Sequence, residues 1–444
     1  MQGQFLKNTL LLTVSGLALQ ALGAVYRMGL AGYLGAQGMG LVQLIFTVGG
    51  LGLTVAVSGV RFGAMRLVSE ALGRGSDREA GAAVLRCLLY AGAFGCLSCV
   101  LLRRSAEALG FLWLEDGRTD TALRLLALEL PFAALSAVFA GYFTATGRLG
   151  RAVSADMLQT LVCMALTALL LHRNRGADLG VQCACITAAG ALAGAFGCCA
   201  LALVYLCDRH SRPRTGQTPP GLTARLLGIS LPLAVSAYAR TGLSTVQHLF
   251  VPRGLQQYGL DPQRALGLYG LIHGMAFQLL LLPTAAVYAG AQLLVPRLTA
   301  MQVRGEQDAI SQLARRATGC TALYAGLCSL ALLLFAGRLS RTLHQGPELA
   351  LYLRCLTPLL PALYTDIAVD ACLKGLGQQL WCMKVNLLEA ALSLGLTWLL
   401  IPRFGVAGFF LVLYAETLMN FGLSLARLAR VLGKERCQGA ADFV

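Results

Sequence analysis

Charged residues are scarce in this sequence. Asp, Glu, Lys and Arg make up 13% of its 444 residues, whereas soluble globular proteins carry roughly 25%. Hydrophobic residues account for 57% of the chain. A soluble chain this apolar would expose hydrophobic patches larger than a monomer tolerates. The composition therefore excludes an ordinary soluble domain and indicates a polytopic membrane protein.

Motifs for nucleotide, metal or nucleic-acid chemistry are also missing. The sequence holds no P-loop, and the glycine pattern of 35–40 joins two apolar segments rather than a strand and a helix. Most of the 15 cysteines lie inside apolar runs, with no histidine at zinc-finger spacing. No basic run is interleaved with aromatic residues. We therefore expect packing cysteines, no metal or organic cofactor, no ATP hydrolysis, no nucleic-acid partner and no enzymatic activity.

Twelve apolar segments are long enough to cross a bilayer, which takes about 20 residues each. They are far longer than the strands of a membrane β-barrel. Because many spans follow the first, we expect that one to stay as an uncleaved helix rather than a signal peptide. The predicted fold class is an all-α polytopic membrane protein. The segments lie near 5–26, 39–60, 82–102, 121–146, 153–172, 180–206, 226–251, 266–295, 317–337, 349–373, 380–402 and 405–428.

The charges of the loops predict the orientation of the chain. Lys and Arg are more frequent on the side that holds both termini, in the loops near 61–78, 209–225 and 297–316. Cytoplasmic loops of membrane proteins carry this excess of positive charge. We therefore expect a multi-pass membrane protein with both termini in the cytoplasm.

An internal repeat divides the spans into two sets of six. Pro131 and Gly147 recur as Pro361 and Gly377 at an offset of 230 residues, and Asp156 and Gln159 align with Asn386 and Glu389. Two lobes with an even number of spans enter the membrane from the same side, and such lobes rock around a central site in transporters. The predicted organisation is an N-terminal lobe at 1–206, a cytoplasmic linker at 207–225, a C-terminal lobe at 226–430 and a cytoplasmic tail at 431–444.

Several stretches resemble a known family. They are FLKNTLLL, LAGYLGAQGMGLVQLIFTV and FAGYFTATGRLGRAVSADMLQ in the first half, and LFVPRGLQQYGLDPQRALGLYGLIHGMAFQLLLLPTAAVYAGAQLLVPRL and LKGLGQQLWCMKVNLLEAALSLGLTWLLIPRFGVAGFFLVLYAETL in the second. Together they resemble the stage V sporulation protein B family of the multidrug/oligosaccharidyl-lipid/polysaccharide (MOP) exporter superfamily, which is related to the lipid II flippase MurJ. The resemblance implies a V-shaped, two-lobed MATE-like transporter that moves lipid-linked peptidoglycan or polysaccharide precursors outward.

Arg240 is the first candidate for substrate binding. It lies in the middle of an apolar span, where an arginine costs about 2.5–3.5 kcal/mol on insertion scales. A guanidinium binds two phosphate oxygens at once, so Arg240 fits the diphosphate of a lipid-linked saccharide. The alternative is an ion pair inside the membrane with Glu129, Asp366 or Asp370.

Further candidates lie at the ends and interiors of other spans. Arg27 and the adjacent Tyr26 end the first span, either as interfacial anchors or at the mouth of a cavity. Relatives often have an arginine in the first span where this chain has Gln20. Gln247 and His273 are polar groups in apolar spans, suited to hydrogen bonds within the core or to the substrate.

Asp366 and Asp370 are the candidates for ion coupling. With Lys374 they occupy positions i, i+4 and i+8 on one face of a helix, so an Asp370–Lys374 bridge is expected. Asp366 lies deeper and could hold a coupling proton or Na⁺.

The predicted function is a flippase that transports an undecaprenyl-diphosphate-linked saccharide from the cytoplasmic to the outer leaflet by alternating access. The expected partners are the bilayer and the lipid-linked saccharide, the expected energy source is a coupling ion or the membrane potential, and the expected state is a monomer. The alternative is an ion-coupled multidrug exporter of the MATE type, which predicts carboxylates rather than arginines along the cavity. A third possibility, an assembly scaffold without transport activity, leaves a charged residue in mid-span without a role.

Overall fold

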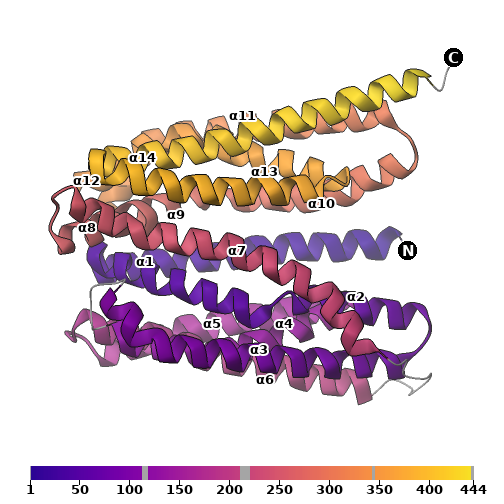
Figure 1. Ribbon diagram of the computed structural model, residues 1–444, viewed down its shortest axis with the longest axis horizontal. Helices are drawn as coiled ribbons and strands as arrows, with labels where there is room; N and C mark the ends of the chain where they lie inside the picture. The colour runs from indigo at the N-terminus through magenta and orange to yellow at the C-terminus, as the bar shows by residue number, and fades with distance from the viewer. Residues whose placement is uncertain (1, 113–118, 211–220, 343–345, 442–444) are drawn as a thin grey trace. The chain divides into compact units, whose positions relative to one another are not determined.

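A computed structural model describes residues 2–112, 119–210, 221–342 and 346–441 (Figure 1). Within these ranges every regular element is helical and no strand occurs. Ten helices are long and apolar enough to cross a membrane. The predicted all-α membrane fold is therefore confirmed. The helices are α1 (Gln2–Val57), α2 (Val60–Gly73), α3 (Asp77–Leu112), α4 (Thr119–Ala145), α5 (Leu149–Arg173), α6 (Leu179–His210), α7 (Leu222–Gln257), α8 (Pro262–Tyr269), η1 (Gly270–Ala276), α9 (Phe277–Leu281), α10 (Thr284–Val303), α11 (Gln307–Thr342), α12 (Pro347–Leu356), η2 (Thr357–Leu359), α13 (Leu360–Gly375) and α14 (Gln379–Ala441).

Two of the ten candidate spans are pairs of helices joined at a sharp turn. Gly35 interrupts α1 with φ 67°, and Gly405 interrupts α14 with φ 57°. Glycine adopts this left-handed conformation without the steric penalty that a Cβ brings. Counted as separate helices, the arms of α1 and α14 bring the number of membrane segments to about the twelve that the sequence predicts.

The contacts within the chain divide it into two compact units. Unit 1 comprises Met1–Ser15 and Leu41–Thr245, and unit 2 comprises Gly16–Gly40 and Val246–Val444. The helices α1 and α7 therefore each contribute residues to both units. The assignment of 16–40 to unit 2 has a local cause, because the backbone around Gly40 packs directly on Leu266 and Gly270.

Unit 1 is organised around α4. This helix packs against α2, α3 and α6, and α6 also packs against α5. Small residues let the backbones approach closely: a Cβ on Gly141 of α4 would lie 2.6 Å from the carbonyl oxygen of Arg61 on α2. Small residues at helix contacts are typical of membrane bundles, because lipid supplies no hydrophobic driving force between helices.

In unit 2, α13 holds the central position. It packs against α10, α11 and α14, and α12 packs against α11. Tyr364 of α13 is fully buried, and its hydroxyl donates a hydrogen bond of 2.5 Å to the carbonyl oxygen of Leu280. That bond satisfies a polar group which would be costly to leave unpaired in an apolar core.

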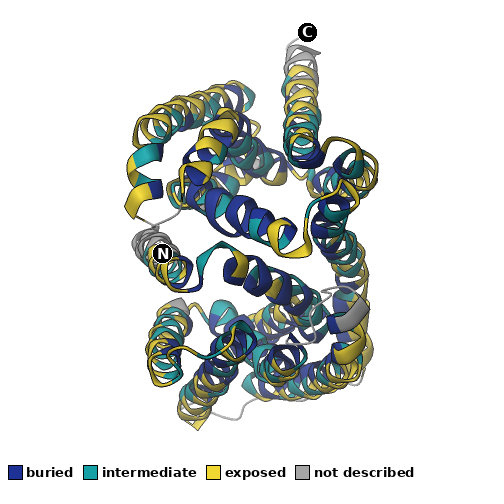
Figure 2. Ribbon diagram, turned by 90° about the vertical axis from the view of Figure 1, so that its left-hand side faces the viewer, coloured by how far each residue is buried: buried dark blue, intermediate teal, exposed yellow. Residues whose placement is uncertain are grey.

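The outward faces of both units are strongly apolar. Buried residues line the contacts between helices, and exposed ones lie along their outer sides (Figure 2). The exposed residues include Leu334 of α11 and Trp398 of α14, at 70% and 66% exposure. A soluble surface would penalise so many large exposed hydrophobic side chains, whereas lipid tails do not.

The repeat noted in the sequence recurs in the backbone geometry. Gly147 lies between α4 and α5 with φ 71°, and Gly377 lies between α13 and α14 with φ 74°. Both residues turn the chain into the next helix through the same left-handed conformation. Equivalent positions of the two sequence halves therefore build the same turn.

Candidate functional site

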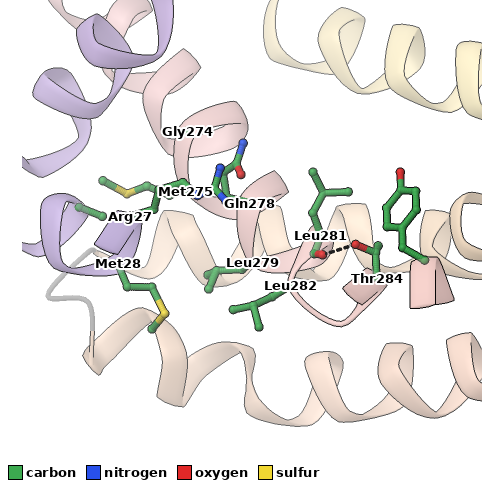
Figure 3. Close-up of a pocket in the computed structure, with 11 residues that line it drawn as sticks. Arg27, Met28, Gly274, Met275, Gln278, Leu279, Leu281, Leu282 and Thr284 are labelled. Atoms are coloured by element: carbon green, nitrogen blue, oxygen red, sulfur yellow. Dashed lines mark hydrogen bonds between the residues drawn. The ribbon is translucent and has the colours of Figure 1, made fainter. Parts of the chain in front are cut away.

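A pocket of about 220 Å³ lies within unit 2, between the first arm of α1 and the broken helix formed by η1, α9 and α10 (Figure 3). Apolar side chains make up most of its wall, and a few polar groups are set among them. Ligand pockets combine these two kinds of lining. The lining residues are Arg27, Met28, Ala31, Gly274, Met275, Gln278, Leu279, Leu281, Leu282, Thr284 and Tyr288.

Arg27 supplies the charge of this pocket. Its Nε donates a hydrogen bond of 3.2 Å to the carbonyl oxygen of Gly23, one turn earlier on α1. No carboxylate pairs with Arg27 among the described residues. The side chain is exposed, so its remaining donors are free for an anion. This geometry is compatible with both roles considered from the sequence, an interfacial anchor and a group at the mouth of a cavity.

The pocket contains polar residues that the sequence analysis did not single out. Gln278 is half-buried, and its amide lines the pocket together with Arg27 (Figure 3). Thr284 and Tyr288 line it from α10. The Thr284 hydroxyl donates a hydrogen bond of 2.5 Å to the carbonyl oxygen of Leu281. Gln278 could have been found from the sequence, because it is a polar residue within an apolar run ahead of Pro283.

His273 lies on the π-helix η1 but does not line the pocket. Its ring stacks on those of Tyr269 and Phe277, with centroid separations of 5.6 and 5.3 Å, and its centroid is 4.4 Å from that of His248. The residue is 9% exposed, and its Nδ1 has no hydrogen-bond partner within the described part of the chain. Because π-helical turns are rare and concentrate at functional sites, η1 marks this wall of the pocket as specialised. His273 itself is buried among these rings, next to Gly274 of the pocket lining.

Arg240 lies near the middle of α7, in the part that belongs to unit 1. Its side chain is exposed and forms no ion pair with any described carboxylate of that unit. Glu129, one of the partners considered from the sequence, instead packs on α6, where a Cβ on Gly190 would lie 3.2 Å from Glu129 Oε2. Within unit 1, Arg240 is therefore a cation without an ion-pair partner among the described residues.

The two aspartates of α13 differ in their surroundings. Lys374 Nζ lies 2.5 Å from Asp370 Oδ2, which confirms the expected bridge. Asp366, one turn deeper, has a buried Oδ1 with no hydrogen-bond partner among the described residues. The ion pair favours a structural role for Asp370, and both aspartates stay candidates for ion coupling.

A second carboxylate in unit 2, Glu416 of α14, escaped the sequence analysis. Ser393 donates a short hydrogen bond to Glu416 Oε2. Gln247 Nε2 lies 2.5 Å from Ser393 Oγ and 3.4 Å from Glu416 Oε2. Neither Lys nor Arg pairs with this carboxylate in the described ranges. The network gives the buried Gln247 hydrogen-bond partners in the core. Glu416, like Asp366, is thus a carboxylate of unit 2 without an ion-pair partner among the described residues.

The remaining sequence candidates lie on the first arm of α1. Tyr26 is half-buried and directly precedes Arg27. Gln20 also lies on α1, but its side chain is outside the described part of the structure. The structure therefore brings Arg27 together with Gln278, places Gln247 with Glu416, and keeps Arg240 within unit 1.

Known proteins resemble this chain both in sequence and in fold. Residues 5–302 match the model of the polysaccharide biosynthesis protein family. Stage V sporulation protein B of Bacillus subtilis (strain 168) is 24% identical over 96% of this chain and 84% of its own. Sporulation protein YkvU of the same organism is 21% identical over 84% of this chain and 83% of its own.

Two solved structures share the fold at low sequence identity. An inward-facing multidrug resistance MATE family transporter of the MOP superfamily is 13% identical with a TM-score of 0.76, covering 96% of this chain and 99% of that one. A MOP superfamily transporter from Pyrococcus furiosus Vc1 is 12% identical with a TM-score of 0.70, covering 97% and 96%. The latter is described as having a binding pocket of reverse polarity that suggests a different function. With more than half of its length matched, the chain belongs to the polysaccharide biosynthesis protein family, and it has the fold of these MOP superfamily transporters.

Proposed function

We propose that the protein flips an undecaprenyl-diphosphate-linked saccharide, a peptidoglycan or polysaccharide unit, from the cytoplasmic to the outer leaflet by alternating access. It acts as a monomer in the bacterial cytoplasmic membrane, with both termini in the cytoplasm. No covalent bond changes, so the protein is a transporter and not an enzyme. The headgroup passes through the protein while the lipid tail stays in the bilayer.

The observation that carries this proposal is the presence of two arginines without ion-pair partners among the described residues. Arg27 lines the pocket of unit 2, and Arg240 is exposed in the middle of α7. An arginine stays charged in a protein and is unfavourable within a bilayer. An anionic headgroup would offset that cost, since a guanidinium binds phosphate oxygens in a bidentate fork.

The volume of the pocket suggests which part of the substrate enters it. Drug-sized ligands occupy pockets of roughly 300–1,000 Å³, and this one is about 220 Å³. It therefore suits the diphosphate linkage or a single sugar rather than a whole oligosaccharide. In this arrangement Arg27 binds the anion and the Gln278 amide bonds an adjacent sugar or phosphate oxygen.

The energy for transport comes from the membrane potential or from a coupling ion. An anion that leaves a negative interior gains roughly 2.3 kcal/mol per charge per 100 mV, which favours outward movement. Bound arginines neutralise part of that gain. A coupling proton or Na⁺ would bind at the acids of unit 2, where Asp366 and Glu416 lie in the bundle without a cationic partner among the described residues.

The test is flipping of a fluorescent undecaprenyl-diphosphate saccharide in proteoliposomes, with and without an inside-negative potential. The variants are Arg27→Ala, Arg240→Ala and Arg240→Lys. Arg66→Ala is the matched control, because it removes an equally basic side chain whose partner is Glu70 at 3.0 Å. We expect wild type and Arg66→Ala to flip, both alanine variants to lose at least tenfold in rate, and Arg240→Lys to lie between them because lysine lacks the bidentate fork.

Two results would contradict the proposal. Unchanged flipping by both alanine variants would remove the arginines from the site. Absence of flipping in vesicles that extrude an organic cation along an ion gradient would instead support the multidrug exporter of the MATE type. Asp366→Asn and Glu416→Gln would then be the variants that abolish extrusion.

A further inference from the structure

The first two helices of unit 1 are separated by a strained break inside the bundle. α1 ends at Val57 and α2 begins at Val60. Between them Ser58 has φ 44°, and it is the one non-glycine residue with positive φ in the described ranges. Its side chain is fully buried. Strained residues persist where their surroundings hold them, and they concentrate at functional sites.

Hydroxyl groups satisfy the backbone that this break exposes. Tyr90 donates a hydrogen bond of 3.2 Å to the carbonyl oxygen of Ser58. Ser58 Oγ and the Tyr238 hydroxyl share a short hydrogen bond, and Tyr238 also lies 3.5 Å from the carbonyl oxygen of Val55. Side chains must replace the lost helical bonds within a membrane, where water is absent. Tyr90 belongs to α3, whereas Tyr238 belongs to α7, so Tyr238 ties α7 to the break.

Close packing along one face of α7 reinforces this tie. A Cβ on Gly59 would lie 2.9 Å from the carbonyl oxygen of Ser230, and one on Gly63 would lie 2.4 Å from Ser230 Oγ. Further along, Thr54 Oγ1 lies 3.4 Å from Thr241 Oγ1. Ser230, Tyr238 and Thr241 recur at helical spacing, so they form one stripe along α7 that faces the break.

The stripe fixes the direction of Arg240. At 100° per residue, Arg240 lies about 160° around the helix from Tyr238, whereas Thr241 lies about 60° from it. Docking Tyr238 and Thr241 on the break therefore turns Arg240 away from the bundle of unit 1 and keeps it exposed. A glycine at position 58 would adopt the left-handed backbone without strain but could not hold Tyr238.

We propose that Ser58 and Tyr238 are positioning residues, which hold α7 in the rotation that presents Arg240 to the diphosphate of the substrate. This inference rests on the proposed function. It explains why a serine stands at a backbone position that suits glycine. Neither residue needs to touch the substrate.

The experiment compares Tyr238→Phe and Ser58→Gly in the wild-type and Arg240→Ala backgrounds. Flipping is measured for diphosphate-linked and monophosphate-linked saccharides with the same lipid. Binding of a prenyl diphosphate without saccharide and thermal stability are measured in detergent. Tyr90→Phe is the matched control, since it removes a hydroxyl that caps the same break without a bond to α7.

We expect Tyr238→Phe and Ser58→Gly to lower flipping of the diphosphate substrate about fivefold, the effect of one lost positioning hydrogen bond. The preference for diphosphate over monophosphate should fall with it. Ser58→Gly should be at least as thermostable as wild type, because it relieves the strained backbone. In the Arg240→Ala background neither variant should reduce flipping further. Tyr90→Phe should keep the diphosphate preference.

Three results would overturn the inference while leaving the flippase intact. They are wild-type flipping by Tyr238→Phe, equal further losses in the Arg240→Ala background, and the same loss of diphosphate preference in Tyr90→Phe. A wild-type protein that neither flips nor binds the prenyl diphosphate would overturn the proposed function, and the positioning role with it. If wild type binds the prenyl diphosphate without flipping, weaker binding by Tyr238→Phe but not by Tyr90→Phe supports the positioning role, and equal binding refutes it.

Discussion

The contact between Gly40 of α1 and Gly270 of η1 permits a quantitative prediction. A Cβ on Gly270 would lie 2.1 Å from the carbonyl oxygen of Ala36 and 2.4 Å from the amide nitrogen of Gly40. An ordinary contact needs about 3.4 Å, so Gly270→Ala requires the two backbones to separate by about 1.3 Å. Both backbones belong to helices and cannot yield as a flexible side chain would.

We expect Gly270→Ala to destabilise the protein by about 3 kcal/mol, the upper part of the usual range for overpacking. For a unit of this size, 1 kcal/mol changes the melting temperature by roughly 2–4 °C, so the expected loss is about 6–12 °C. Because η1 begins at Gly270 and its Gly274 and Met275 line the pocket, binding of a prenyl diphosphate should weaken as well. The assay is thermal unfolding in detergent, with and without that ligand.

Other glycines of the same unit provide a graded set of controls. A Cβ on Gly274 would lie 3.4 Å from the carbonyl oxygen of Met39, which is an ordinary contact, and one on Gly32 would meet nothing within 4 Å. Gly274→Ala should therefore change stability little, and Gly32→Ala should gain up to about 1 kcal/mol from its helical position. The argument from backbone approach is wrong if Gly270→Ala has the same melting temperature as Gly32→Ala. It is also wrong if Gly274→Ala lowers the melting temperature as much as Gly270→Ala does.

Three further predictions concern charges and thiols. Asp208→Asn should cost about 3 kcal/mol, measured as a lower melting temperature, because this fully buried carboxylate pairs with Arg151 at 2.9 Å and accepts a bond of 2.7 Å from Tyr142. Glu348→Gln breaks only an exposed pair and should cost at most about 1 kcal/mol; equal losses in the two variants would contradict this distinction. Glu416→Gln should abolish the dependence of flipping on a proton or Na⁺ gradient while flipping driven by the potential persists, and a retained gradient dependence would exclude Glu416 as the coupling acid. A reducing agent should leave the melting temperature unchanged, since every described cysteine is a free thiol, and a shift would indicate a disulfide.

Sequence patterns were sufficient for the features of the fold that depend on local composition. Apolar segments of about 20 residues located the spans, and the matched Gly147 and Gly377 marked two turns of the same geometry. The π-helix at Gly270–Ala276 was not predicted, because a segment with ordinary helical periodicity adopts it only through its tertiary contacts. The left-handed backbone conformation of Ser58 was not predicted either, because the only local indication in the sequence is the glycine that follows it.

The candidate site was predictable only in part. Arg27, Arg240 and Asp366 could be named from the sequence because a charge in an apolar run is conspicuous. Glu416 and Gln278 were missed, although both are polar residues in such runs. For Glu416 the informative fact is its contact with Gln247 and Ser393, and residues so far apart in the chain cannot be paired from a single sequence.

From the pairing of charges we infer which charged residues stabilise the fold and which serve transport. Asp208 and Asp370 each pair with a cation of their own unit, so the fold itself offsets the cost of placing them there. Arg27 and Arg240 lie in membrane helices without an ionic partner among the described residues, so no ion pair of the fold offsets the cost of their charge. Neutral replacements of these two arginines should therefore stabilise the protein or leave its stability unchanged while they impair transport. Replacement of the paired aspartates should do the opposite, with lower stability and unaltered substrate preference in the protein that remains folded.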